Sequence, residues 1–170
     1  RRRKEYMNMV ILGLPGAGKS TLLKYLLYKY NSMFKNLVPI YIELKGDKGF
    51  KSHFLDIEKP IKLTDIRSYI EDYIEHIMPD ASTELYEYLT KSKAAQNLEY
   101  VFFCDGLDEI SREEYLRFTK VANQICDYRG HRVVISSREI GFSEKDYQGF
   151  KLYSLLDFED ERQIEYIERS

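Results

Sequence analysis

The chain has 170 residues, of which 44% are hydrophobic and 32% charged, and its formal net charge is −2. This length and composition fit one globular domain with enough apolar surface for a core. The near-neutral charge gives no global attraction to nucleic acid or to anionic membranes. Because no apolar run approaches the roughly 18–20 residues that cross a bilayer, we expect no membrane partner. The charge balance argues against a nucleic-acid partner, and two cysteines that are interpreted as reduced thiols favour a cytoplasmic protein.

The N-terminal quarter of the sequence predicts a strand, a helix and a second strand. Residues 1–6, which are basic from Arg1 to Lys4, are interpreted as an arm that leads into a short buried strand at 7–12. A second strand is predicted at 37–44, with Pro39 near its start, where a missing N–H is tolerated. Between them, a helix follows a glycine-rich stretch and carries one apolar face, made up of Leu22, Leu23, Leu26, Leu27 and Tyr30.

The middle of the sequence predicts two helices and a third strand. The polar stretch at 45–60 has no assignable pattern, but a periodic apolar face begins at Thr64 or Asp65 and runs to Ile77. A second helix is expected at about 81–93, and the apolar run at 98–105 favours a buried strand.

The C-terminal part predicts a helix between strands. Ser111 and Glu114 form a capping box, and the apolar face of the helix that follows consists of Tyr115, Phe118, Val121, Ala122 and Ile125. Strands are expected at 131–138 and 150–155, and a last helix near Asp157. Strands separated by helices predict an α/β fold, a three-layer sandwich around a mainly parallel sheet of about five strands.

The glycine-rich stretch from Gly13 to Ser20, GLPGAGKS, fits the phosphate-binding pattern G-x-x-x-x-G-K-[ST] of a P-loop. Glycines let successive N–H groups point at phosphate oxygens, because a side chain there would clash or would need a positive φ. The lysine reaches the β- and γ-phosphates and the Ser20 hydroxyl is placed to ligate Mg²⁺. The predicted nucleotide-binding residues are Gly13, Pro15, Gly16, Ala17, Gly18, Lys19, Ser20 and Thr21. The alternative is a plain strand-to-helix turn.

An acidic motif, DGLDE, follows the third predicted strand. Asp105 ends that strand, at the edge where α/β sheets bind ligands, so its carboxylate is placed to hold Mg²⁺ through water. Asp108 and Glu109 follow on a loop, where one of them is expected to orient or deprotonate an attacking water. The alternative is an acidic loop that favours the N-terminus of the next helix.

A third motif, VVISSRE, places Ser136, Ser137 and Arg138 at the end of another apolar strand. Arg138 is therefore expected at the same ligand-facing edge, where it would contact the γ-phosphate. The alternative is a surface arginine paired with Glu139 or Glu144.

Together, GLPGAGKST, DGLDE and VVISSR resemble the NACHT group of STAND P-loop NTPases, the signalling ATPases of innate immunity and programmed cell death. The Asp-Gly-x-Asp-Glu spacing is the most specific part, since many other P-loop ATPases place Glu directly after the strand-ending Asp. The resemblance implies that the 131–138 strand lies between the 7–12 and 98–105 strands. In one departure, Glu139 stands where family members often carry proline.

The resemblance implies a nucleotide-controlled switch. ATP or ADP and Mg²⁺ are the expected cofactors, with the metal held by Ser20 and Asp105 and a catalytic group of Asp108, Glu109 and Arg138. ADP would keep the protein closed, and exchange for ATP would permit homo-oligomerisation and activate an attached effector. The effector and sensor domains are expected outside this chain, whose residues 1–155 would form the NTPase core and 156–170 the start of a helical domain.

Two other functions remain open from the sequence. A small-molecule P-loop kinase needs arginines on a mobile lid to hold the transferred phosphoryl group, and no compact arginine-rich segment is present. A ring-forming mechanical ATPase shares the P-loop and the acidic strand end. The two cysteines, Cys104 and Cys126, lie in segments expected to be packed and are interpreted as free thiols.

Overall fold

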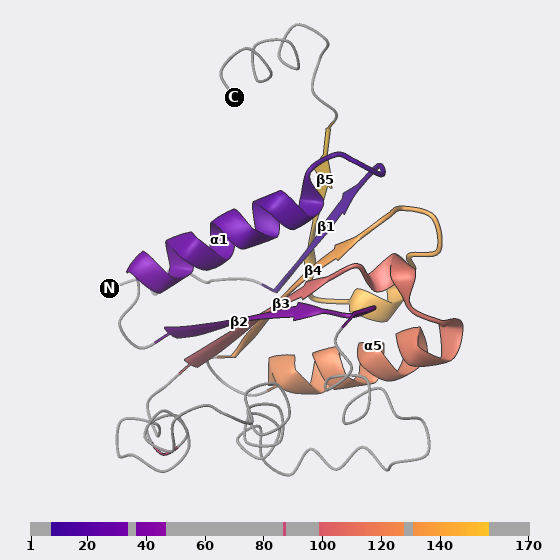
Figure 1. Cartoon of the computed structure of the whole chain (residues 1–170). Helices are drawn as coiled ribbons and strands as arrows, with labels where there is room; N and C mark the ends of the chain where they lie inside the picture. The colour runs from indigo at the N-terminus through magenta and orange to yellow at the C-terminus, as the bar shows by residue number, and fades with distance from the viewer. Residues whose placement is uncertain (1–7, 34–36, 47–86, 88–98, 128–130, 157–170) are drawn as a thin grey trace, which may run out of the picture.

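A single parallel sheet forms the centre of the molecule (Figure 1). The computed structural model describes residues 8–33, 37–46, 87, 99–127 and 131–156. The strand order is β2-β3-β4-β1-β5, and every described pairing is parallel. The strands are β1 (Met9–Gly13), β2 (Leu37–Glu43), β3 (Glu99–Asp105), β4 (Arg132–Ser137) and β5 (Lys151–Leu155).

Helices cover both faces of this sheet. Helix α1 (Lys19–Met33) lies on one face and α5 (Arg112–Asp127) on the other (Figure 1). Two short 3₁₀ helices, η3 (Leu107–Glu109) and η4 (Glu144–Tyr147), lie in the segments that follow β3 and β4. The result is the predicted α/β three-layer sandwich, and all the parallel strands end at the same edge of the sheet.

The strands alternate between two apolar clusters because successive side chains point to opposite faces. On β3, Phe102 and Cys104 pack in the cluster on the α5 side, whereas Val101 and Phe103 pack in the cluster on the α1 side. Both faces are covered, which is why β3 is apolar at almost every position rather than alternately polar. Each such side chain that is fully removed from water contributes about 1.5–3 kcal/mol.

The predicted helix faces are confirmed. On α1, Leu23 is fully buried and its predicted neighbours pack partly buried against the same cluster. On α5, the buried residues are Phe118, Val121, Ala122 and Ile125, with Tyr115 partly buried against them. The capping box is also confirmed, since the Ser111 N–H donates to the Glu114 carboxylate at 2.8 Å and the Glu114 N–H donates to the Ser111 hydroxyl at 3.3 Å.

The strand limits differ from the predicted ones by one or two residues. Strand β1 begins at Met9 rather than residue 7 and includes Gly13, and β2 stops before Leu44. The predicted start of the third strand at residue 98 lies outside the described residues. Among the described strands β2 lies at an edge of the sheet, the position where proline is tolerated inside a strand. The position of β4 between β1 and β3 is the order that the family resemblance implied.

Several predicted elements lie outside the described residues. These are the basic arm at 1–6, the two helices at 64–77 and 81–93, and the last helix from Asp157. Both cysteines are free, with Cys104 buried and Cys126 partly exposed. Within the part of the chain that the structure describes, no helix combines the length and the apolar character needed to span a bilayer.

Candidate functional site

The P-loop joins β1 to α1 at the carboxyl edge of the sheet. Its glycines serve two different needs. Gly16 and Gly18 have φ values of 80° and 84°, a backbone conformation that residues other than glycine rarely adopt, although an added Cβ would meet open space. Gly13 is packed instead, because a Cβ there would lie 3.2 Å from the Leu155 carbonyl oxygen of β5.

Lys19, the first residue of α1, reaches back across the loop. Its Nζ donates to the carbonyl oxygens of Gly13 at 2.9 Å and Leu14 at 2.8 Å. The ammonium therefore lies against the loop, in which the Ala17 N–H donates to the Leu14 carbonyl oxygen at 3.2 Å. Ser20 and Thr21 follow in the first turn of α1 and are exposed. A glycine-rich loop, a lysine and a helix N-terminus are groups whose N–H donors and positive charge suit an anion such as phosphate.

Asp105 ends β3 and is held by hydroxyl groups from both neighbouring strands. The Tyr41 hydroxyl of β2 donates to Asp105 Oδ2 at 2.7 Å, and the Ser136 hydroxyl of β4 donates to Oδ1. Ser136 Oγ also accepts the Gly106 N–H at 2.9 Å. Burial, followed by the hydrogen bond to Asp105, raises the pKa of Tyr41 well above its ordinary value, so the phenol stays protonated and remains a donor.

The acidic pair lies on η3, directly beyond Asp105. Leu107 anchors this turn in the apolar core, and Gly106 before it has a φ of 81°. Asp108 then accepts two bonds from Arg138, one from its backbone N–H and one from its guanidinium Nε, both at 2.9 Å. The side chain of Asp108 is 10% exposed, whereas that of Arg138 is 48% exposed.

Glu109 has a different environment from Asp108. Its carboxylate lies 3.2 Å from the Lys45 ammonium just beyond β2, and both side chains are exposed, Lys45 by 70% and Glu109 by 41%. Such a pair contributes at most about 1 kcal/mol. The two adjacent carboxylates therefore contact different parts of the molecule, and Asp108 is the one fixed against the end of β4.

The structure brings the predicted residues to one edge of the sheet but groups them differently from the expectation. Arg138 contacts Asp108, in place of the alternative partners Glu139 or Glu144. Tyr41 is the residue that sequence reasoning missed. Its place follows from the strand register, because Tyr41 pairs with Phe103, two residues before Asp105, and so lies on the same face of the sheet. No local pattern in the sequence indicates that pairing.

The loop and the Asp105 carboxylate have the space, charge and lone pairs that a magnesium nucleotide requires. The positive-φ glycines leave open space where phosphate oxygens would approach, and Lys19 supplies the charge beside it. A carboxylate has about four lone-pair positions, of which hydroxyl hydrogens occupy two at Asp105. The residues present therefore fit a nucleotide phosphate chain and a metal held through water.

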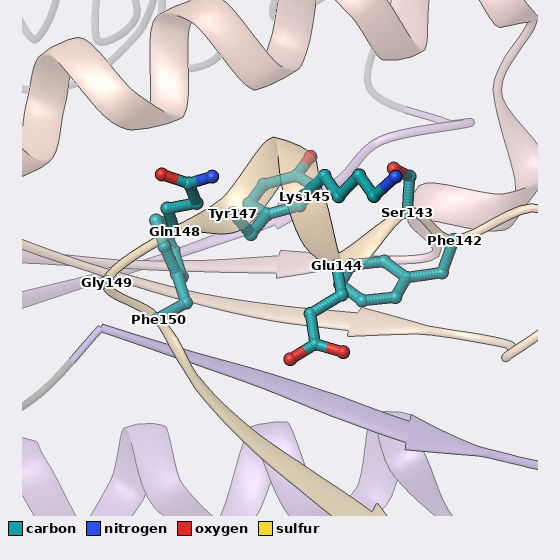
Figure 2. A pocket seen from close by; sticks show the side chains of 8 residues that line it. All are labelled: Phe142, Ser143, Glu144, Lys145, Tyr147, Gln148, Gly149 and Phe150. Atoms are coloured by element: carbon teal, nitrogen blue, oxygen red, sulfur yellow. The ribbon is translucent and has the colours of Figure 1, made fainter.

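A separate hollow lies within the segment between β4 and β5. It has a volume of about 590 Å³, and Figure 2 shows the side chains around it, with the Phe142 and Tyr147 rings beside each other. The rings of Phe142 and Tyr147 stack at 5.4 Å, and Phe150 meets Tyr147 edge-on at 5.2 Å. None of the predicted phosphate-binding or catalytic residues lines this hollow.

Solved structures with the same fold were found by structural comparison. One is the Aeropyrum pernix Orc1 protein in complex with DNA, at a TM-score of 0.57 and 12% identity, over 99% of this chain and 44% of that one. A second is C. elegans PCH-2, with a TM-score of 0.53 and 12% identity, over 95% of this chain and 40% of that one. A third is Cdc6p from Pyrobaculum aerophilum, with a TM-score of 0.53 and 13% identity, over 94% of this chain and 41% of that one. No protein-family model and no curated protein matches the chain.

These neighbours are AAA+ ATPases, a branch of the P-loop NTPase superfamily. At 12–13% identity the likeness shows the fold, and the chain spans less than half the length of each neighbour. The predicted fold class is confirmed: the chain has a P-loop NTPase fold with a five-stranded parallel sheet.

Proposed function

We propose that this chain is the nucleotide-binding core of an ATP-binding, slowly hydrolysing signalling switch of the NACHT type. The observation that supports this best is that Asp105 and the Asp108–Arg138 pair lie at the same edge of the sheet as the P-loop, because β4 pairs with both β1 and β3. The glycine after Asp105 carries the chain through a positive φ, so the acidic pair comes later, on η3. An ATPase with glutamate directly after the strand-ending aspartate would not need this turn.

The P-loop residues bind the nucleotide in this proposal. Backbone N–H groups of the loop, those of Gly16 and Gly18 among them, would donate to the phosphate oxygens. Lys19 would move its ammonium from the two carbonyl oxygens to the β- and γ-phosphates. Ser20 and Thr21 contribute hydroxyl groups at the N-terminus of α1, where the helix dipole favours negative charge.

Ser20 and Asp105 are the residues that would hold Mg²⁺, Asp105 through water. The metal, when bound, neutralises charge that develops on the β- and γ-phosphates. Asp105 keeps its carboxylate at the sheet edge through the bonds from Tyr41 and Ser136.

Asp108, Glu109 and Arg138 are the proposed hydrolytic group. Asp108 is paired with Arg138, so neither group is free to act while that contact holds. An arriving γ-phosphate would compete for the guanidinium and release the Asp108 carboxylate to orient water. A site in which the acid and its arginine must first separate is consistent with slow hydrolysis.

The wider role rests on the same proposal. ADP would hold the full-length protein closed, and ATP would permit oligomerisation that activates a fused effector in a defence pathway. The helical domain expected to begin at about residue 156 would contribute the closing contacts. The adenine nucleotide is the small-molecule partner, in the cytoplasm, and we expect no nucleic-acid partner for this core.

A ring-forming ATPase is the second candidate, and the fold comparison favours it specifically. The structural neighbours Orc1, PCH-2 and Cdc6p are AAA+ ATPases. In the full-length protein, assembly that requires ATP and is lost with ADP supports the switch. Stable rings with both nucleotides and fast turnover would favour the second candidate.

The test of nucleotide binding is a thermal melt of wild type and Lys19→Ala with Mg-ATP, Mg-ADP and Mg-GTP. A ligand at about 100 times its Kd stabilises by roughly 2.7 kcal/mol, which raises the midpoint by about 5–10 °C for a chain of this size. We expect that rise with adenine nucleotides, a smaller one with GTP, and none with Lys19→Ala.

Lys29→Ala is the matched control, since Lys29 is exposed on the same helix and its ammonium lies over the Tyr25 ring. A wild type whose midpoint ignores nucleotide, or a Lys19→Ala variant that responds as wild type does, would contradict the proposal. Product analysis should give ADP and free phosphate. Turnover that rises strongly when a nucleoside or sugar is added would indicate a kinase instead.

A further inference from the structure

The carboxylate of Asp105 is held symmetrically by the two strands that flank β3. The Tyr41 hydroxyl donates to Oδ2 at 2.7 Å, and the Ser136 hydroxyl donates to Oδ1. Ser136 is itself fixed, because it is fully buried and its oxygen accepts the Gly106 N–H. Each carboxylate oxygen therefore receives one hydroxyl hydrogen, which leaves the carboxylate a defined orientation with lone pairs still available.

The sheet register explains why these three residues meet. Tyr41 is paired with Phe103, and Phe103 with Val134. Asp105 and Ser136 each lie two residues further along their own strand, so all of these side chains project from the α1 face. Tyr41 is paired with the residue two positions before Asp105, and the long phenol side chain spans that offset to reach the carboxylate.

The ring of Tyr41 also links the carboxylate to the P-loop helix. It packs partly buried in the cluster under α1, and the Lys24 ammonium of α1 lies 5.4 Å from its centroid. Such a cation–π contact is worth about 0.5–1 kcal/mol at an exposed site. Tyr41 thus touches both parts of the proposed metal site, the helix that begins with Lys19 and Ser20 and the strand that ends with Asp105.

We propose that Tyr41 is a positioning residue for the magnesium nucleotide: with Ser136 it fixes the orientation in which Asp105 meets the metal-bound water. This inference rests on the proposed function. Groups that orient a metal ligand without touching the metal change metal affinity on the order of 10–100-fold when removed. Tyr41 is expected to act at the lower end of that range, since Ser136 remains.

The test compares wild type with Tyr41→Phe, which removes the hydroxyl but keeps the ring beneath α1 and the contact with Lys24. The thermal midpoint is followed in ADP while Mg²⁺ is titrated, and ADP binding is measured separately in EDTA. We expect the variant to need on the order of tenfold more Mg²⁺ for the same stabilisation. Its affinity for metal-free ADP should stay within about twofold of wild type.

Two further variants sharpen the result. Tyr28→Phe, on the exposed face of α1, is the matched control and should behave as wild type. Ser136→Ala removes the other donor and should shift the Mg²⁺ requirement in the same direction, although its metal-free stability falls because the Gly106 N–H loses its acceptor. A purely structural role for Tyr41 would lower the metal-free midpoint and leave the Mg²⁺ requirement unchanged.

The outcomes separate this inference from the proposed function. A wild type that ignores nucleotide would overturn both. A wild type that responds to Mg²⁺ while Tyr41→Phe titrates identically would overturn the positioning role and leave the proposed function standing. A variant that binds Mg²⁺ more tightly would mean that the phenol competes with the metal for Asp105, which also overturns the inference.

Discussion

His131 illustrates how a single polar residue is used in this molecule. It is buried beside Tyr100, its ring lies 5.5 Å from that ring, and its Nδ1 accepts the Tyr100 N–H at 3.1 Å. The imidazole therefore satisfies a backbone donor at the start of β3. Asp105 differs because its two hydroxyl partners leave it facing the edge where a ligand would approach, which is why its neighbourhood is the one to probe by mutation.

At the residue scale, the structure predicts that Asp108 and Glu109 are not equivalent. Asp108→Asn keeps an oxygen for the Arg138 N–H but loses the charge opposite the guanidinium, so it should cost about 1 kcal/mol of unfolding free energy. Glu109→Gln should change stability by less than about 0.5 kcal/mol, because its pair with Lys45 is solvent-exposed. Urea unfolding of both variants measures the difference.

The same two variants separate the hydrolytic roles under the proposed function. Phosphate release should fall strongly with Asp108→Asn while nucleotide-induced stabilisation persists. Equal activity of Asp108→Asn and wild type would remove Asp108 from the hydrolytic group and leave Glu109 as the remaining carboxylate.

At the element scale, α5 supports the segment that connects Arg138 to β5. The Tyr115 hydroxyl donates to the Asp146 carboxylate at 3.3 Å and accepts the Ser143 N–H at 3.2 Å. About two turns further along, the Asn123 amide donates to the Asp146 carbonyl at 3.0 Å. Because α5 starts just after η3, which carries the acidic pair, this helix connects the segment that follows β3 with the segment that follows β4.

The start of α5 provides an element-scale prediction. Ser111→Ala removes the hydroxyl that accepts the Glu114 N–H and should cost about 1 kcal/mol of stability. Ser143→Ala is the matched control, since Ser143 precedes the short helix η4 without a side-chain capping bond. Chemical unfolding should show a lower midpoint for the first variant alone. Equal midpoints would mean that the capping box contributes nothing measurable.

At the scale of the whole molecule, ionisable groups packed against the sheet should make the fold sensitive to alkaline pH. Burial raises the pKa of the Cys126 thiol from 9.0 to about 12, and burial also raises the pKa of Cys104, Tyr115 and Tyr147. The unfolded chain loses these protons first. The contribution of these neutral groups to the free energy of unfolding is therefore fully present below about pH 9, and it is lost as the pH rises toward 12.

Urea unfolding at pH 8 and pH 10.5 tests this. For Cys126 alone the loss across that interval is on the order of 2 kcal/mol, and the tyrosines add to it. Cys126→Ala should show a smaller decrease, because one ionising group is gone. A free energy of unfolding that is constant from pH 8 to 10.5 would show that these groups ionise equally in the folded and unfolded chain.

The sequence by itself determined the features that depend on neighbouring residues. The P-loop pattern, the apolar runs of the five described strands, the helix faces and the Ser111–Glu114 capping box all follow from local spacing, because a strand repeats every second residue and a helix every 3.6. The strand limits do not follow from local spacing, because the partner strand decides where a strand begins and ends, as it does where Gly13 pairs with Leu155.

Only the tertiary structure decided which side chains meet at the edge of the sheet. Tyr41 and Asp105 are separated by 64 residues, and Asp108 and Arg138 by 30. Their contacts depend on the order β2-β3-β4-β1-β5 and on the register of each pair. Local periodicity fixes neither, because any order of buried parallel strands satisfies the same apolar pattern. The order becomes unique only when the whole sheet is packed between its helices, and with it the partners of Asp105.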